Sequence, residues 1–405
     1  MKKNIMIVGD GQNYSLDTHE TKLNNNVLVV GTSGSGKTRS IVTPNLLQAS
    51  GSYVVTDPKG NLYRQYGPYL KKKGYDVKKL DFTDPMHSVH YNFFHYIRSS
   101  LDIIKVSHML QAPPGNMPNR MDPFWDEAAQ LLIQSLIAYL YEACPEENQN
   151  LHDILRLISY AHIDENDASC KTVLDRLFED WERAKPDSYA VSTYKKFRIA
   201  AGKTLRSIMI TVNARIGLYD APEVMEMMSD DTVHLETIGR KKTALFVVVS
   251  DTDRSMDGLV NTFFTQAMNE LCRVADKECK DNRLPVPVRF IMDDFATNCK
   301  IDDFPRMIAS IRSREISVML MIQAESQLKA GYGEDGQTII GNCDTYVYLG
   351  GNDVDTAQAV ARRCDVPLKR ILNMPVGTNW VFRRGSEPLN GKILDLNRYL
   401  EEREL

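Results

Sequence analysis

The stretch NVLVVGTSGSGKTR (Asn26–Arg39) decides the fold that we predict for this chain. It begins with an apolar run typical of a buried strand, passes through a glycine-rich turn and continues into a segment with a helical pattern. Gly31 and Gly36 frame four residues. Lys37 and Thr38 follow directly, which is the spacing of a phosphate-binding loop, or P-loop. A chance match in a glycine-rich turn is the alternative, but strand, turn and helix occur in the required order.

The residue types of this loop match the chemistry of a nucleoside triphosphate. Glycines let the backbone curl so that successive N–H groups point at phosphate oxygens, and the helix start adds further N–H donors. The lysine supplies a positive charge to the β- and γ-phosphates, and the threonine hydroxyl is a Mg²⁺ ligand. We therefore expect ATP and Mg²⁺ as cofactors, with the nucleotide bound by Gly31, Gly34, Ser35, Gly36, Lys37, Thr38 and Arg39.

A second stretch supplies the acidic groups that phosphoryl transfer needs. Residues 289–292 form an apolar run that ends in Asp293 and Asp294. A carboxylate at the end of a neighbouring strand holds the Mg²⁺ ion, and another group orients the attacking water. We predict that Asp293 is the metal carboxylate and Asp294 the catalytic base. A helix cap or a solvated turn is the alternative for this acidic pair.

Two further side chains are predicted to take part in catalysis together with Lys37. Gln323 follows the apolar run 318–322, where it would sense the γ-phosphate or position water; a turn amide is the alternative. Arg312 and Arg314 precede the same run. A guanidinium there is suited to reach the phosphate of a neighbouring subunit, and ordinary surface arginines are the alternative.

The chain as a whole predicts an α/β fold with a mostly parallel sheet and an inserted all-helical domain. Helical patterns dominate residues 98–236, whereas short apolar runs typical of buried strands occur on both sides. Pro44 should end or kink the helix after the P-loop. Asp57 and Lys59 end one strand run, either as ligand or subunit contacts or as a solvated turn. The predicted divisions are 1–97 and 237–405 for the nucleotide-binding domain and 98–236 for the insertion.

Composition limits the class of protein. The 405 residues carry a net charge of −4, with 43% hydrophobic and 25% charged residues. These values are typical of a globular protein, and they argue against a chain coated in nucleic acid, although a local basic channel is compatible with them. Seven scattered cysteines with no Cys-x-x-Cys pair indicate a reduced, cytoplasmic chain. No run approaches the length of a membrane span.

Seven motifs occur in an order that carries a family likeness. The set resembles the TraG/TraD-type coupling proteins of conjugation and type IV secretion, most closely those of Gram-positive mobile elements. The likeness covers most of the chain, and the motifs are specific as a set. They are Gly31–Thr38, Thr56–Gly60, Pro123–Trp125, Phe290–Ala296, Ile311–Ile316, Ile322–Leu328 and Ile340–Asp344.

The resemblance implies a RecA-like P-loop NTPase that works as a homo-hexamer. Such a motor delivers relaxase-bound single-stranded DNA to the secretion channel, and its helical domain receives the substrate. It also implies nucleotide binding by Gly36, Lys37 and Thr38, metal binding by Thr38 and Asp293, and a sensor role for Gln323. By its position relative to that glutamine, Arg312 matches the family's trans-acting arginine better than Arg314 does. The basic segments 195–198 and 203–206 would meet DNA or the relaxosome, or form a solvated helix face.

Two departures from the family pattern leave alternatives open. The family usually has Asp-Glu where this chain has Asp293-Asp294, and the shorter carboxylate is compatible with slow hydrolysis. The family also usually carries an N-terminal membrane segment. We expect either a separate partner that anchors the chain at the inner face of the membrane, a trimmed chain, or a cytosolic one. The alternative functions are a related FtsK/HerA-type or packaging DNA motor and a nucleotide-gated recruitment module with little hydrolysis.

Overall fold

A computed structural model describes residues 4–111, 123–161, 171–200, 202–295, 297 and 299–403. The chain forms two compact units, each built from segments that are separated in sequence. Unit 1 takes in the described parts of Met1–Lys79, His234–Asp251 and Ala267–Leu405, and unit 2 takes in those of Leu80–Val233 and Thr252–Gln266. The domain boundaries that we predict from the sequence, 1–97, 98–236 and 237–405, are not tested by this division into units and stay a prediction.

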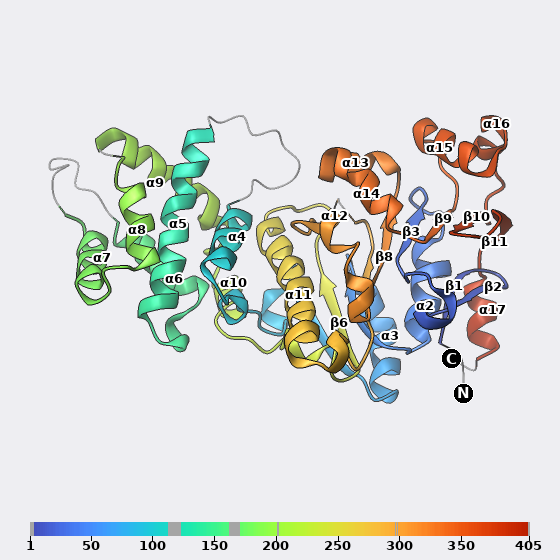
Figure 1. Ribbon diagram of the computed structural model, residues 1–405, viewed down its shortest axis with the longest axis horizontal. Coiled ribbons are helices and arrows are strands. Elements are labelled where there is room, and N and C mark those ends of the chain that lie inside the picture. Colours follow the sequence, from blue (N-terminus) through green and yellow to red (C-terminus); the bar gives the residue numbers. More distant parts are fainter. Residues whose placement is uncertain are drawn as a thin grey trace. The chain divides into compact units, whose positions relative to one another are not determined.

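Unit 1 is organised around a mixed nine-stranded sheet (Figure 1). Each predicted strand run is found as a strand, so the α/β fold with a mostly parallel sheet is confirmed. The strands, in their order across the sheet, are β11 (Leu389–Lys392), β10 (Thr378–Arg383), β9 (Thr345–Tyr348), β3 (Val27–Val30), β8 (Ile316–Ile322), β7 (Val288–Met292), β4 (Ser52–Thr56), β6 (Thr243–Val248) and β5 (Asp76–Asp81).

The centre of the sheet is parallel and its β11 side is antiparallel. β3 pairs in parallel with β8 and β9, and β7 pairs in parallel with β8 and β4. β10 instead runs antiparallel to both β9 and β11. Because the central strands point the same way, the segments that follow β3, β4, β7 and β8 all leave the sheet at one edge, where ligands bind in open parallel sheets.

One face of the sheet is packed against the helices that follow β3 and β4. Its core combines alternate side chains of the strands, such as Val27 and Val29 of β3, with Leu46 and Leu62 from the helices. All four are at most 5% exposed. This alternation follows from the two-residue period of a strand, which sends every second side chain to the same face.

The helix after the P-loop does not end at Pro44, so the prediction that it ends early is wrong. A π-helical segment, η1 (Lys37–Val42), passes directly into α2 (Thr43–Leu47). Pro44 lies in the first turn of α2, where a missing N–H group is tolerated. Thr43 still donates its N–H to Thr38 O, as the π-helical pattern requires, so the change of helix type occurs at the residue before the proline.

A two-stranded hairpin that the sequence did not predict packs beside α2. It consists of β1 (Ile5–Gly9) and β2 (Gln12–Ser15), which pair antiparallel. The buried amide of Asn45 connects it to α2: the Ile7 N–H donates to Asn45 Oδ1 at 3.0 Å, and Asn45 Nδ2 donates to Ile7 O at 2.7 Å. A single asparagine therefore satisfies both backbone groups of one strand residue.

One long helix, α11, has its first residues in unit 2 and its last in unit 1. The remaining helices of unit 1, listed here together with α11, connect and cover the strands. They are α1 (Thr18–Thr21), α3 (Asn61–Lys72), η6 (Leu235–Thr237), α11 (Asp257–Glu278), η7 (Lys280–Asn282), α12 (Phe304–Met307), η8 (Ile311–Arg314), α13 (Glu325–Tyr332), η9 (Gly333–Asp335), α14 (Gly336–Gly341), α15 (Val354–Cys364), α16 (Leu368–Leu372) and α17 (Leu396–Glu401).

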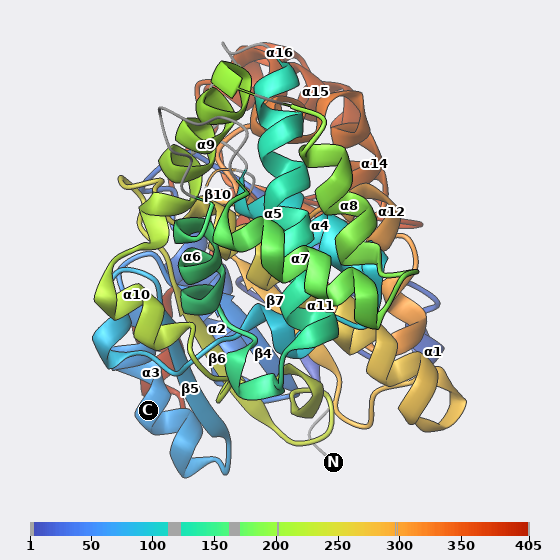
Figure 2. The ribbon, with the colours of Figure 1, turned by 90° about the vertical axis from the view of Figure 1, so that its left-hand side faces the viewer.

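Unit 2 is built mainly from helices, with α5 lying alongside α8 and α9 in both views (Figure 1 and Figure 2). No helix among the described residues is long and apolar enough to cross a membrane. The helices are η2 (Pro85–His87), η3 (Phe93–Tyr96), α4 (Ser100–Leu110), α5 (Pro123–Ala143), η4 (Glu146–Asn148), α6 (Leu151–Ser159), α7 (Val173–Ala184), α8 (Tyr189–Phe197), α9 (Gly202–Ile216), η5 (Gly217–Tyr219) and α10 (Pro222–Met227).

Two of the predicted basic side chains in unit 2 have acidic partners. Arg198 Nε lies 2.9 Å from Asp175 Oδ1, and Lys195 is ion-paired with Glu182. The side chain of Lys203, in the second basic segment, lies outside the described residues. Because these two cations are paired, the segment 195–198 fits the solvated helix face better than a row of free cations that would meet DNA.

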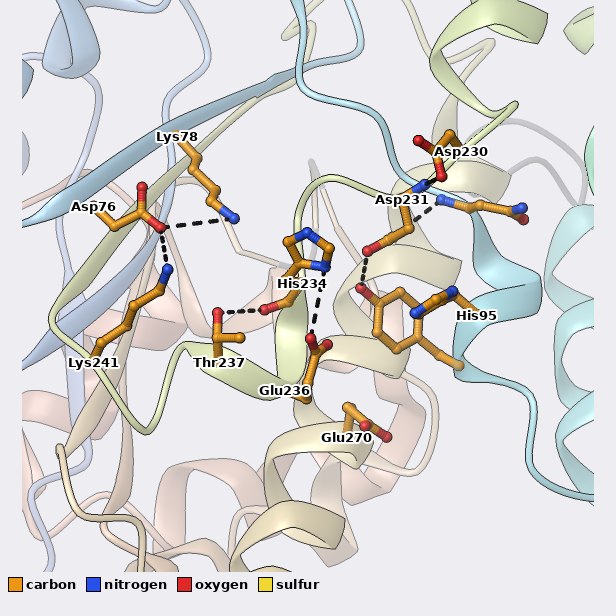
Figure 3. Close-up of polar contacts among 12 residues, drawn as sticks. Asp76, Lys78, His95, Asp230, Asp231, His234, Glu236, Thr237, Lys241 and Glu270 are labelled. Carbon is orange, nitrogen blue, oxygen red and sulfur yellow. Dashed lines mark hydrogen bonds and ion pairs between the residues drawn. The ribbon is translucent and has the colours of Figure 1, made fainter. Parts of the chain in front are cut away.

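The segment that follows unit 2 is fixed in unit 1 by local polar contacts (Figure 3). Lys241 Nζ lies 2.8 Å from Asp76 Oδ2, and the same carboxylate oxygen lies 3.8 Å from Lys78 Nζ. His234 adopts a left-handed backbone conformation (φ 52°) and accepts a hydrogen bond from Thr237 Oγ1 at its carbonyl oxygen. Its ring lies 3.7 Å from Glu236. The chain thus enters β6 through a tight turn that is held by these hydrogen bonds and ion pairs.

Candidate nucleotide site

The P-loop leaves β3 in a conformation that requires glycine at three positions. A Cβ atom at Gly31 would lie only 2.5 Å from Ser35 Oγ and 2.9 Å from the Cβ of Leu349. Gly34 and Gly36 have φ angles of +77° and +93°, in the left-handed region that L side chains rarely adopt. The predicted glycines therefore allow the backbone to curl at the carboxyl edge of the sheet.

Lys37 is folded back onto the loop that it follows. Its side chain is buried, and Nζ donates to Gly31 O at 2.6 Å and to Thr32 O at 3.1 Å. Burial lowers the pKa of this amine, while the charges of Asp294 and Asp293 act in the opposite direction. The ammonium group is thus held at the loop by backbone oxygens and lies in the field of both predicted carboxylates.

The predicted metal ligands are in direct contact. Thr38 Oγ1 donates a hydrogen bond to Asp293 Oδ2 at 2.8 Å, which joins the start of η1 to the end of β7. A third residue, Thr56 at the end of β4, fixes the aspartate backbone: the Asp293 N–H donates to Thr56 Oγ1 at 2.5 Å, and Thr56 Oγ1 lies 3.1 Å from Asp293 O. The sequence did not indicate this role for Thr56, which is visible only once the register of β4 and β7 is known.

The donor set fits a magnesium ion that arrives with its nucleotide. One hydroxyl and one carboxylate oxygen come from the chain, and Mg²⁺ takes its other ligands from phosphates and water. Among the described residues, no group of three or more His, Cys, Asp or Glu side chains could hold a metal ion. Thr38 and Asp293 stay the predicted metal ligands.

Asp294 occupies a strained backbone position beside this pair. Its φ angle is +51°, a left-handed conformation that is costly for most side chains but tolerated by Asp and Asn. Its side chain is half-buried, unlike that of the adjacent Asp293. The short carboxylate at a position where the family usually has glutamate is thus compatible with the local backbone.

Gln323 follows β8 at the same edge of the sheet as the P-loop. The Gly31 N–H donates to Ile322 O at 3.1 Å, so the residue before Gln323 contacts the first residue of the loop. The Gln323 side chain is exposed, and the backbone N–H of Gln323 donates to Gln327 Oε1 at 2.7 Å. This position agrees with the predicted proximity to phosphate, whereas its sensor role stays a prediction.

Arg39, the last predicted nucleotide contact, lies beside the C-terminal segment of unit 1. It is exposed, and its Nη2 donates to Asn397 Oδ1 at 3.1 Å. A Cβ at Gly36 would meet Ile393 at 3.4 Å. Residues 393–397 therefore border the P-loop, which the sequence did not indicate because some 350 residues separate the two segments.

The arginine predicted to act on a neighbouring subunit lies at the opposite edge of the sheet. η8 precedes β8, whereas the P-loop follows the parallel strand β3, so Arg312 is separated from its own nucleotide site by the length of the sheet. Arg312 is exposed and donates to Thr18 O at 3.3 Å. Arg314 instead forms two hydrogen bonds with Asp276, both 2.8 Å long.

The two polar residues that end β4 differ from each other. Asp57 is 2% exposed, burial raises its pKa, and its Oδ2 accepts the N–H of Tyr63 at 2.8 Å. This aspartate therefore shapes the turn into α3, but it is buried, so it is not the solvated charge that one of the two alternatives expected. Lys59 is exposed and lies 3.9 Å from Asp251.

Replacement of Asp293 by asparagine should stabilise the nucleotide-free chain at neutral pH and weaken Mg²⁺ binding. Burial raises the pKa of Asp293, so this carboxyl favours the folded state only below its unfolded pKa of about 3.9, and that contribution is lost as pH rises through the raised value. Thermal unfolding should give a higher midpoint for Asp293→Asn at pH 7 and converging midpoints near pH 4. The gain in nucleotide affinity from Mg²⁺ should fall at least about tenfold. An unchanged Mg²⁺ response would remove Asp293 from the metal site.

The fold and the site together define a class of protein. A strand, a P-loop and a helix are joined to a neighbouring strand whose terminal aspartate is bonded to the P-loop threonine, on a mostly parallel sheet. This arrangement is that of a RecA-like P-loop NTPase, as the sequence predicted.

The chain belongs to the family described as type IV secretory system conjugative DNA transfer, whose model matches residues 2–365. It is 22% identical over 375 residues to the conjugal transfer protein TraG of Escherichia coli and 23% identical over 349 residues to VirD4 of Rhizobium rhizogenes. Each alignment covers 83% of this chain but only 54% and 48% of those relatives, so the chain spans about half their length. The predicted Gram-positive branch stays a prediction.

Solved structures of the bacterial conjugative coupling protein TrwB share the fold. The unbound form of TrwBdeltaN70 has a TM-score of 0.70 at 16% identity, covering 97% of this chain and 89% of that solved chain. The complex of TrwB with ADP and Mg²⁺ has a TM-score of 0.65 at 18% identity, covering 91% and 85%. At these identities the likeness supports the fold, and the roles of individual residues have to be argued from the chain itself.

Proposed function

We propose that this chain is the subunit of an ATP-driven motor that delivers relaxase-bound single-stranded DNA to a conjugative type IV secretion channel. The family and the TrwB complex with ADP and Mg²⁺ support this proposal. The observation that carries it is the 2.8 Å hydrogen bond between Thr38 and Asp293, because it brings the P-loop and the metal carboxylate together without a ligand.

ATP and Mg²⁺ would supply the hydrolysable phosphate and its charge-neutralising metal. The Lys37 amine would exchange the carbonyl oxygens of Gly31 and Thr32 for the β- and γ-phosphates, since it is already held at the loop. Thr38 and Asp293 would hold the metal. Asp294 would orient the attacking water, and Gln323 would sense the γ-phosphate.

The position of Arg312 supports a working assembly of more than one copy. An exposed guanidinium at the edge of the sheet opposite the P-loop is suited to a neighbour's nucleotide rather than its own, and the family's homo-hexamer provides that arrangement. The helical insertion, residues 98–236, would receive DNA, relaxase and channel components.

A nucleotide-gated recruitment module is the second candidate, and Asp294 favours it. The carboxylate is one methylene shorter than glutamate and sits on a left-handed backbone, where a longer side chain would be less well accommodated. Such a site would bind ATP and assemble but hydrolyse slowly.

A single measurement separates the two candidates. ATP hydrolysis is followed with and without single-stranded DNA, together with the particle mass in each condition. The motor is expected to hydrolyse ATP faster with DNA and to form ring-sized particles. Nucleotide binding and assembly without DNA-stimulated turnover would support the recruitment module and contradict the motor.

A further inference from the structure

A cavity of about 420 Å³ lies at the edge of the sheet where β4, β7 and β8 begin, opposite the P-loop edge. It is bordered by α1, the end of β2 and the turn before β4. Several of its lining groups are hydrogen-bonding side chains. They include Ser15, Ser50, Ser52, Ser317, Arg289 and Arg312.

The base of this cavity holds a buried arginine. Arg289 is the second residue of β7, its side chain is 7% exposed, and it lies between Tyr53 of β4 and Ser317 of β8 in the sheet register. Its Nε donates a hydrogen bond to Ser317 Oγ at 3.3 Å. Within the described residues no hydrogen bond is found for its two terminal nitrogens, and the side chain lines the cavity.

The carboxylates around the cavity have other partners. Asp17 accepts the backbone N–H groups of His19 and Glu20 at the start of α1. Glu20 accepts a hydrogen bond from Ser15 Oγ, and Glu315 is ion-paired with Arg283. None of them forms an ion pair with Arg289 in the described part of the chain.

A charged group in this position is energetically unfavourable without an anion. An ionised side chain removed from water is costly unless it is paired and hydrogen-bonded, and desolvation accordingly lowers the pKa of Arg289. A hydrophobic side chain would fill the same place at lower cost. A buried arginine that faces a polar cavity is therefore best explained by a ligand that the cavity admits.

We propose that this cavity is a second phosphate-binding site, in which Arg289 pairs with a phosphate group and the Ser317 hydroxyl, which accepts from Arg289, donates a further hydrogen bond. A guanidinium group presents two parallel N–H donors that match two phosphate oxygens. Arg312 lines the same cavity, so a bound phosphate would lie near the arginine that we assign to the subunit interface. The phosphate could belong to a free ion or to a nucleotide.

The test removes the first phosphate site before it measures the second. In full-length chain carrying Lys37→Ala, inorganic phosphate and, separately, Mg-ATP are titrated by calorimetry, and thermal unfolding midpoints are recorded with each. Arg289→Met is then added. Its matched control is Arg306→Met, which removes an exposed arginine of unit 1 outside the cavity.

Phosphate should raise the unfolding midpoint of the Lys37→Ala chain, and Arg289→Met should weaken its affinity at least about tenfold while the control leaves it unchanged. A response to both ligands identifies any phosphate group as the ligand, and a response to ATP alone identifies a nucleotide phosphate. Binding that survives Arg289→Met, or no binding to the Lys37→Ala chain, overturns the proposal. Arg289→Lys, which keeps the charge but not the fork, provides the same comparison if the methionine variant does not fold.

Discussion

Lys37→Ala is expected to lower ATP affinity roughly 10- to 100-fold and to bring hydrolysis below detection, because a charge-assisted contact with the phosphates is lost. The side chain is buried against the carbonyl oxygens of Gly31 and Thr32, so the lysine is held within reach of the loop before nucleotide binds. ATP affinity is measured by titration, and turnover by phosphate release.

The control for this variant is Lys59→Ala, which removes an exposed lysine that follows β4. Both variants should unfold cooperatively, since the amine of Lys37 is disfavoured by burial and its removal relieves that cost. ATP affinity equal to wild type in Lys37→Ala would place the nucleotide elsewhere. The phosphate cavity at Arg289 is tested by adding Arg289→Met to this same Lys37→Ala chain, so failure of that test would leave the loss of ATP affinity in Lys37→Ala itself unchanged.

Arg312→Ala is expected to reduce turnover about 10³-fold or more while ATP binding stays within about twofold of wild type. This range is typical of an arginine that stabilises a transferring phosphate from a neighbouring subunit. In a single chain the guanidinium lies at the edge of the sheet opposite the P-loop, so it does not reach the nucleotide of its own subunit. The measurements are steady-state hydrolysis and equilibrium nucleotide binding.

A mixing experiment tests whether the contact is made between subunits. Chains carrying Arg312→Ala keep an intact Asp294, and chains carrying Asp294→Ala keep an intact arginine. Mixed assemblies should regain part of the activity, because some interfaces combine the two intact groups. Absence of any recovery would contradict action between subunits. Arg314→Ala serves as the control: its two hydrogen bonds to Asp276 predict lower stability instead of this pattern.

The site could be predicted where the chemistry depends on residues close together in the sequence. The glycines, lysine and threonine of the P-loop are contiguous, and Asp293 directly follows an apolar strand. The edge at which they meet follows from parallel pairing alone. The sequence predicts that Thr38 and Asp293 both bind the metal, and the structure places the two side chains, 255 residues apart, in contact with each other.

Other features depend on register and long-range pairing, which local patterns do not reveal. Thr56 was predicted only as the end of a strand, and its hydroxyl reaches the backbone of Asp293 because β4 neighbours β7. The hairpin of β1 and β2 was not predicted because its two strands have only five and four residues and pair with each other alone. β11 was missed because it is a short, largely exposed strand at the edge of the sheet. Arg289 was part of an apolar run, and its burial became visible only when β4 and β8 were placed on its two sides.

The π-helical turn after the P-loop has a consequence for how the chain can vary in length. A π turn accommodates one residue more than an α turn, and each residue of an α-helix advances the side chains by about 100°. Loss of one residue from Arg39–Val42 would turn this segment into an ordinary α turn, and α2 would keep the face that it presents to the sheet. Leu46 would stay in the core, and the Asn45 amide would stay bonded to β1. A one-residue deletion should therefore disturb the packing of α2 less in this short segment than in a regular α-helix, where it would rotate the following residues by that angle.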